Sequence, residues 1–134
     1  MADLLPTGKI EKGWGYEILW TNNQQYSAKL LVFTRNGAKT SMIYHKDRRK
    51  SWFVNEGKFL LRFCDTAKAE YKEVFLETGS AFEVETMTPH QLESLTDMAV
   101  ILEVGTPDYD ADRYRIMPGD SQRRPPEPPQ APLS

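Results

Sequence analysis

The sequence predicts an all-β fold, a sandwich or barrel of short strands. Strand-like segments follow one another at intervals of about 8–12 residues, and turn-forming residues separate them. No long amphipathic helical pattern interrupts the series, and neither an internal repeat nor heptads occur. A chain of 134 residues suits one domain of this kind.

The strands are placed by their alternation and by the turn residues that end them. Asn36-Gly37 is expected to be a hairpin-type turn, Glu56-Gly57 to join two strands, and Thr78-Gly79 to end another. The first dozen residues are expected to form an arm, so that the barrel with its arm spans residues 1–120. The expected strands cover residues 15–20, 27–34, 39–45, 51–56, 58–63, 69–77, 80–85, 90–95 and 98–104.

The composition is ordinary for a globular protein, with a hydrophobic share of 40% and a charged share of 27%. A net charge of -2 offers no field that attracts nucleic acid or an anionic membrane, so neither is an expected partner. Cys64 is the only cysteine, which excludes an intrachain disulfide and agrees with a reducing compartment. With no apolar run near the roughly 18 residues of a membrane span and no signal peptide expected, we predict a cytoplasmic location.

The last segment, SQRRPPEPPQAPLS at residues 121–134, carries five of the nine prolines. Proline cannot join a strand ladder, so we predict a proline-rich disordered tail. Arg123, Pro126 and Pro129 also match the RxxPxxP spacing of an SH3-domain ligand, although a plain disordered end is the commoner meaning of such a tail.

One of the two histidines, His45, lies in GAKTSMIYHKDRRKSWFVNEG. This stretch resembles the first cupin motif, G(X)5HXH(X)3–4E(X)6G, with Gly37 and Gly57 as its frame and His45 at the second histidine position. Ile43 stands at the first histidine position and Lys50 at the glutamate position. The resemblance implies a double-stranded β-helix, that is, a cupin or jelly-roll barrel.

The second cupin motif, G(X)5PXG(X)2H(X)3N, is matched less fully. Gly79 opens it and His90 fills the histidine position, whereas Glu85, Met87 and Ser94 replace the proline, glycine and asparagine. Within the cupins, KGWGYEILW, residues 29–54 and LEVGTPDYDADRYRI resemble the mannose-6-phosphate isomerase-like group, including the C-terminal domain of mannose-1-phosphate guanylyltransferase/isomerase enzymes. That likeness implies a sugar-phosphate isomerase-like protein and a homodimer.

In cupins that bind metal, two histidines and a glutamate of the first motif join one histidine of the second. Here only His45 and His90 remain as metal ligands, for Zn, Mn, Fe or Ni. Two imidazoles make a poor cage, and the ammonium of Lys50 repels a divalent ion. A degenerate metal site is therefore one expectation.

Direct binding of an anion is the alternative use of the same pocket. Lys50 beside two imidazoles makes the interior positive, which suits the phosphate of a sugar phosphate or a carboxylate. Strand alternation places Lys29 on the inner face, and Arg62 is expected at the rim, so Lys29, Lys50 and Arg62 are the expected ligand-binding residues.

If the protein is an enzyme, aldose–ketose isomerisation needs a base and an electrophile. Lys50 would supply the positive charge and His45 or His90 the base. A non-catalytic ligand-binding barrel and a structural or partner-binding barrel stay open beside this hypothesis.

Two further charged clusters have simpler interpretations. The basic residues Lys46, Arg48, Arg49 and Lys50 are most often a solvated loop surface, although they could also meet a phosphate. Asp108, Asp110 and Asp112 alternate like calcium ligands, but they lack the glycine and distal glutamate of an EF-hand loop, so we expect a polar loop.

Overall fold

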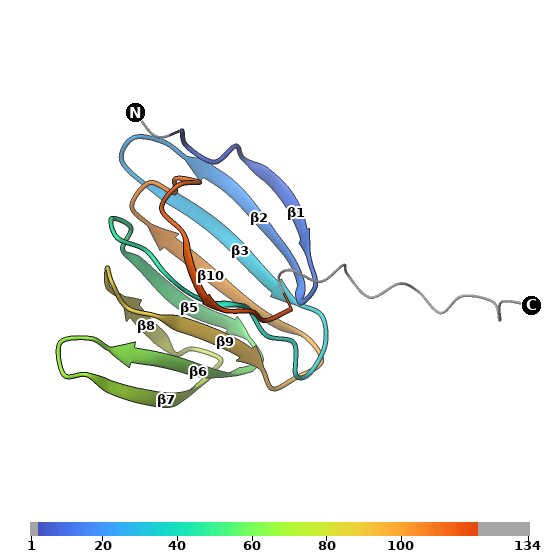
Figure 1. The fold of residues 1–134 in the computed structure, drawn as a ribbon. Coiled ribbons are helices and arrows are strands. Elements are labelled where there is room, and N and C mark those ends of the chain that lie inside the picture. The colour runs from blue at the N-terminus through green and yellow to red at the C-terminus, as the bar shows by residue number, and fades with distance from the viewer. Residues whose placement is uncertain (1–2, 121–134) are drawn as a thin grey trace, which may run out of the picture.

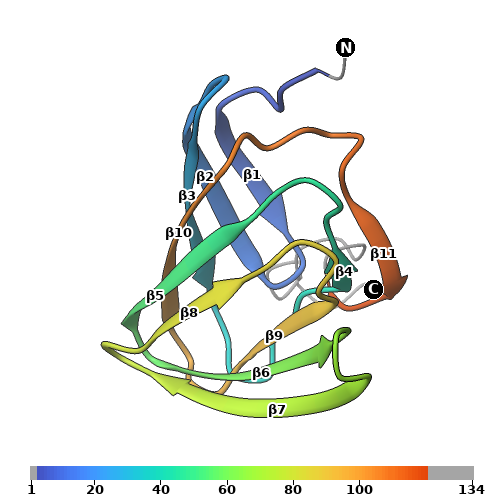
Figure 2. The same ribbon diagram turned by 90° about the vertical axis from the view of Figure 1, so that its left-hand side faces the viewer.

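Two antiparallel β-sheets face each other in the computed structural model, which describes residues 3–120 (Figures 1 and 2). The sheets have the orders β1-β2-β3-β10-β5-β8 and β11-β4-β9-β6-β7. The strands are β1 Gly8–Lys12, β2 Gly15–Asn22, β3 Ser27–Phe33, β4 Met42–Tyr44, β5 Lys50–Glu56, β6 Lys58–Asp65, β7 Glu70–Glu77, β8 Ala81–Val84, β9 His90–Ser94, β10 Ala99–Gly105 and β11 Tyr114–Met117. The all-β prediction is confirmed, and each expected strand has a counterpart among β2 to β10.

The predicted N-terminal arm is wrong in one respect, because residues 8–12 form the edge strand β1. This strand pairs with β2 from Gly8 opposite Leu19 to Lys12 opposite Gly15. A second strand, β11, was not expected and pairs with β4 at the edge of the other sheet. Both edge strands are exposed along most of their length, so neither carries the apolar–polar alternation of a half-buried strand.

Asn36-Gly37 forms a turn but not a hairpin. Gly37 has a φ of +86°, which a glycine adopts without strain, yet β3 and β4 on its two sides belong to different sheets. The turn therefore carries the chain from one layer of the barrel to the other. Gly57, with a φ of +90°, does the same between β5 and β6.

The inward-facing side chains change from charged to apolar along the strands. Lys29, Leu31 and Phe33 face inward on β3, and their partners on β10 are Glu103, Ile101 and Ala99. At the apolar end Phe33 stacks on Trp14, with ring centroids 4.5 Å apart, and meets Phe59 edge-on at 5.0 Å. One end of the barrel is thus a packed hydrophobic core and the other holds buried charges.

The proline-rich tail, with its SH3-ligand spacing, lies outside the described residues. Within residues 3–120, no helix is long and apolar enough to cross a membrane.

Candidate functional site

Lys50 begins β5 and points into the barrel rather than to solvent. Its side chain is buried, and its Nζ lies 3.3 Å from Nε2 of His45, 3.5 Å from Oε1 of Glu103 and 5.4 Å from the ring centre of Trp52. Burial lowers the pKa of Lys50 to about 8; Glu103 opposes this change and Arg48 adds to it. The ammonium is thus held inside the barrel by one carboxylate and one imidazole.

Both histidines are buried with their rings held by backbone carbonyls. Nδ1 of His45 donates to the carbonyl oxygen of Asp112 at 2.6 Å, and Nδ1 of His90 donates to that of Thr88 at 2.8 Å. A carbonyl oxygen only accepts, so each ring carries its proton on Nδ1 and each Nε2 is an acceptor. Burial, reinforced by the charge of Lys50, lowers the pKa of His45 to about 3 and that of His90 well below its usual value.

The two Nε2 atoms differ in what they meet. Nε2 of His45 accepts from the ammonium of Lys50, whereas Nε2 of His90 is buried without a hydrogen-bond partner among the described residues. The ring centroids are 5.8 Å apart. A buried acceptor without a donor costs free energy, on the order of 1–3 kcal/mol, and marks a place where a ligand atom can bind.

Glu103, on β10, is the carboxylate at the centre of the buried charges. It accepts hydrogen bonds from Nη1 of Arg48 and from Nε1 of Trp52, both at 2.8 Å. Burial alone would raise the pKa of Glu103, but Lys50 and Arg48 hold it well below its usual value. Glu103 therefore stays ionised and fixes the side chains around it.

Lys29, on β3, is the second buried lysine. Its Nζ lies 2.8 Å from Oδ2 of Asp108, 3.7 Å from Oε2 of Glu17 and 3.9 Å from Oε2 of Glu103. Burying a charge is costly unless it is paired, so these carboxylates explain how the lysine is kept inside. Because these carboxylates are paired with Lys29, little of their negative charge remains to neutralise the other cations nearby.

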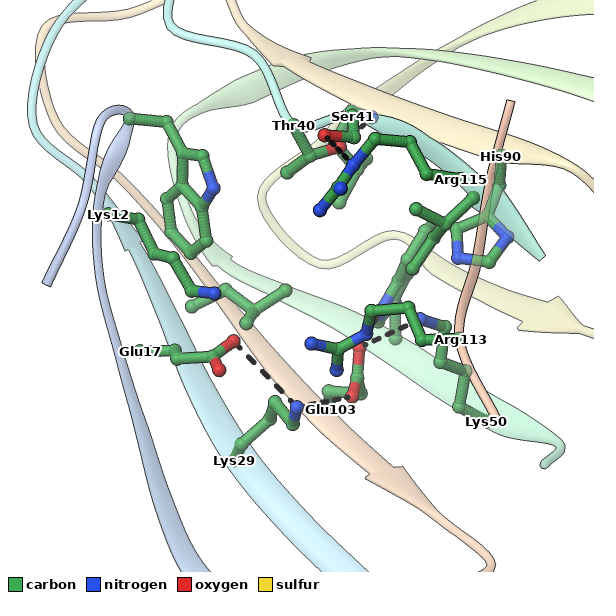
Figure 3. A pocket seen from close by; sticks show the side chains of 15 residues that line it. Lys12, Glu17, Lys29, Thr40, Ser41, Lys50, His90, Glu103, Arg113 and Arg115 are labelled. Carbon is green, nitrogen blue, oxygen red and sulfur yellow. Dashed lines mark hydrogen bonds and ion pairs between the residues drawn. The ribbon is translucent and has the colours of Figure 1, made fainter. Parts of the chain in front are cut away.

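A cavity of about 80 Å³ opens beside these groups between the two sheets (Figure 3). Lys12 from β1 and Arg113 and Arg115 from the β11 side point into it from opposite walls (Figure 3). The lining residues are Lys12, Trp14, Glu17, Lys29, Leu31, Thr40, Ser41, Ile43, Lys50, Trp52, His90, Leu92, Glu103, Arg113 and Arg115. Five of them are lysine or arginine and two are glutamate, so the cavity has an excess of positive charge.

The cations at the mouth are only partly neutralised. Burial lowers the pKa of Lys12; Glu17 opposes this, while Arg113, Lys29 and Arg115 add to it. Nε of Arg113 has no hydrogen-bond partner among the described residues, and Nη2 lies 3.8 Å from Asp108. A group of partly neutralised cations of this kind is typical of an anion-binding site.

The donor set does not match a divalent metal. His45 and His90 are oriented as metal-binding histidines are, with Nδ1 held by a backbone carbonyl. However, Nε2 of His45 faces the ammonium of Lys50, and Ile43 offers no ligand atom. Within residues 3–120, no group of three His, Cys, Asp or Glu side chains could hold a metal ion. No chemical step is therefore assigned to a metal.

The structure brings His45, His90, Lys50 and Lys29 together but leaves Arg62 apart. Arg62 does not line the cavity; its guanidinium lies 2.9 Å from Glu93 and 3.4 Å from Glu73. Its strand neighbour Leu61 is fully buried, and alternation along β6 therefore turns Arg62 outward.

The basic loop and the aspartate run both contain buried residues. Arg48 is 1% exposed and Lys50 6% exposed, so the expectation of a solvated loop is wrong for both. Asp112 is buried as well, and its carboxylate accepts hydrogen bonds from the backbone N–H groups of Lys46, Asp47 and Arg48. The aspartate binds this loop rather than calcium.

Several residues of the site were not expected from the sequence, namely Lys12, Glu17, Glu103, Arg113 and Arg115. The sequence pattern could have indicated two of them. Glu17 alternates with the buried Leu19, and Glu103 with the buried Ile101, so both share the inward phase of their strands. Arg113 and Arg115 lie beyond the last expected strand, where no pattern placed them.

Comparison with known proteins identifies the fold. CapF from Staphylococcus aureus has a TM-score of 0.72 and 16% identity, with 84% of this chain and 34% of that chain covered. Oxalate decarboxylase from Bacillus subtilis has a TM-score of 0.72 and 16% identity, with coverages of 87% and 32%. KdgF from Halomonas sp. has a TM-score of 0.58 and 18% identity, with coverages of 72% and 81%.

These neighbours are cupin-fold proteins, and the chain has the cupin fold, as the two motifs predicted. It spans about a third of the length of CapF and of oxalate decarboxylase. One oxalate decarboxylase structure concerns Mn(II) centres of that enzyme. No family model matches the chain, and no curated protein matches it. At these identities the likeness concerns the fold and not the mannose-6-phosphate isomerase-like group.

Proposed function

We propose that this cupin-fold protein binds a small anionic molecule, a sugar phosphate or a carboxylate, in the cavity between its sheets. The observation that carries the proposal is the charge of the lining, five lysine or arginine side chains against two glutamates. Glu17 and Glu103 already lie beside buried lysines, so a bound anion is what would balance the remaining cations.

Lys50 supports this function in a specific way. The resemblance to metal-binding cupins implies a carboxylate at this position and a cation held by it. Here the side chain itself carries the positive charge, at the place where both imidazoles meet. An ammonium binds phosphate or carboxylate as a point charge, so it provides the attraction that a metal would otherwise supply.

Calorimetric titration with inorganic phosphate, carboxylates and sugar phosphates tests the proposal. Lys12→Met and Arg113→Met are expected to weaken binding about tenfold each, because each removes one charge from the mouth. Arg62→Met is the matched control, since Arg62 is a paired cation outside the cavity. The absence of saturable binding by every anion, or equal losses in all three variants, would contradict anion binding.

Isomerisation of the bound molecule is a second candidate, favoured by the unpartnered Nε2 of His90. A neutral imidazole could accept a proton from a carbon next to a carbonyl, and the nearby ammonium of Lys50 would stabilise the enediolate. The test is interconversion of mannose 6-phosphate and fructose 6-phosphate, with and without Mn²⁺, Zn²⁺ or Ni²⁺. Binding without turnover under every condition would leave a non-catalytic ligand-binding barrel.

A further inference from the structure

The cavity offers two kinds of polar contact that a simple anion cannot satisfy together. Lys12 and Arg113, which point into the cavity, are donors that are only partly neutralised (Figure 3). Nε2 of His90 is an acceptor, because the ring proton is on Nδ1, and needs a donor. Phosphate dianions and plain carboxylates present only acceptor oxygens, so they would leave His90 unsatisfied.

A hydroxyl group meets the second requirement. Its proton donates to Nε2 of His90, while its oxygen remains free to accept a hydrogen bond from another lining group. No hydrogen-bond donor of the described residues reaches this nitrogen. The imidazole stays neutral, since Lys50 adds to the effect of burial on its pKa. A molecule with an anionic end and a hydroxyl group would satisfy both kinds of contact.

The walls and the size of the cavity narrow the class further. Trp14, Leu31, Ile43, Trp52 and Leu92 are apolar lining residues, which suit a short carbon chain between the two polar ends. The cavity is small, about 80 Å³, and opens to solvent. A hydroxy acid with a few carbons fits within this space, whereas a hexose phosphate would extend out of it into solvent.

We infer that the ligand is a small hydroxy carboxylic acid, with its carboxylate held by Lys12 and Arg113 and a hydroxyl group donating to Nε2 of His90. This inference rests on the proposed anion binding and adds the hydroxyl requirement and the size limit. It assigns His90 to ligand recognition whether or not the protein catalyses a reaction.

A matched pair of ligands tests the inference on the unmodified chain. Glycerate and propanoate share a three-carbon carboxylate, and only glycerate carries hydroxyl groups. Calorimetric titration is expected to show glycerate binding at least about fivefold tighter, since it gains one hydrogen bond and satisfies a buried acceptor. The ratio of the affinities for glycerate and propanoate is expected to fall to about one in His90→Phe and to stay unchanged in Arg62→Met.

The outcomes separate this inference from the proposed function. Equal affinities for glycerate and propanoate would overturn the hydroxyl requirement while leaving anion binding intact. Tighter binding of a hexose 6-phosphate than of glycerate would overturn the size limit in the same way. If no carboxylate or phosphate binds, both the inference and the proposed function fail.

Discussion

The ammonium of Lys50 donates a hydrogen bond to Nε2 of His45 across 3.3 Å. That nitrogen is the one which a metal-binding histidine of this orientation would offer to the ion, because Nδ1 is already held by a backbone carbonyl. The positive charge of the site thus belongs to the chain itself.

Lys50→Glu is expected to create a metal site. The change sets a carboxylate beside two imidazole Nε2 atoms, a donor set that suits Fe, Mn, Ni or Zn. A second buried carboxylate near Glu103 also makes a bound cation favourable. Elemental analysis after dialysis against Ni²⁺ or Mn²⁺ should find about one ion per chain in the variant. Lys50→Gln is the control, and tight retention of metal by the unmodified protein would contradict this account.

Anion binding is expected to weaken as the pH rises through about 8, the pKa of Lys50. Below this pH the lysine is charged and attracts the anion; above it the charge is lost. The loss should approach tenfold between pH 7 and 9, since one pKa unit corresponds to about 1.4 kcal/mol. Titration of propanoate across this range measures it. The slope should be shallower in Lys50→Met, where Lys12 remains with its lowered pKa.

Stability is expected to fall as the pH drops below 6.5, the usual pKa of histidine. His45 and His90 have lowered pKa values when folded, so in acid the unfolded chain binds protons that the folded chain does not. From pH 7 to pH 5 each histidine should remove about 2 kcal/mol from the free energy of unfolding. Urea denaturation measures this, and His90→Gln should show a smaller loss. NMR titration of either folded histidine near 6.5 would refute the explanation.

Asp112→Ala is expected to destabilise the fold by about 3 kcal/mol, because a buried carboxylate that accepts from the backbone of Lys46 and Arg48 is lost. Asp110→Ala is the matched control, since Asp110 is exposed in the same segment and should change stability by less than about 0.5 kcal/mol. Urea midpoints compare the two variants, and equal effects would show that Asp112 does not hold the loop.

A homodimer remains the expectation from the cupin resemblance, and the outer face of the six-stranded sheet is the surface we propose for it. Trp20, Phe53 and Val104 are apolar and about half exposed there. Val104→Glu should convert a dimer to a monomer in size-exclusion chromatography with light scattering. Phe75→Glu is the control, because Phe75 is 76% exposed on β7 of the other sheet. A monomeric unmodified protein would contradict the proposal.

The motif spacing correctly predicted which residues lie together in the site. It did not predict the residues that surround them. The frame from Gly37 to Gly57 placed His45 and Lys50 in one site, and strand alternation placed Lys29 beside them, as the structure has them. These relations depend on short-range spacing and on the two-residue period of a strand, both of which the sequence contains.

The surrounding residues depend on contacts between distant segments. Glu103 can be buried only because Trp52 on the neighbouring strand β5 and Arg48 in the loop before β5 donate hydrogen bonds to it, and nothing in the run MAVILEV indicates those donors. Arg113 reaches the cavity because β11 pairs with β4, about seventy residues earlier in the chain. Neither the hydrophobic periodicity nor the composition of the sequence indicates which distant strands pair.

The pairing of β11 with β4 also sets an order for the assembly of the cavity during synthesis. The ribosome makes the chain from its N-terminus, so β1 to β10 emerge before Arg113, Arg115 and the carboxylate of Asp112. At that stage the residues of the hydrophobic core and both histidines have been made, but Arg113 and Arg115 of the cavity wall have not. The anion binding proposed here is therefore expected only after translation has passed β11 and this strand has paired with β4.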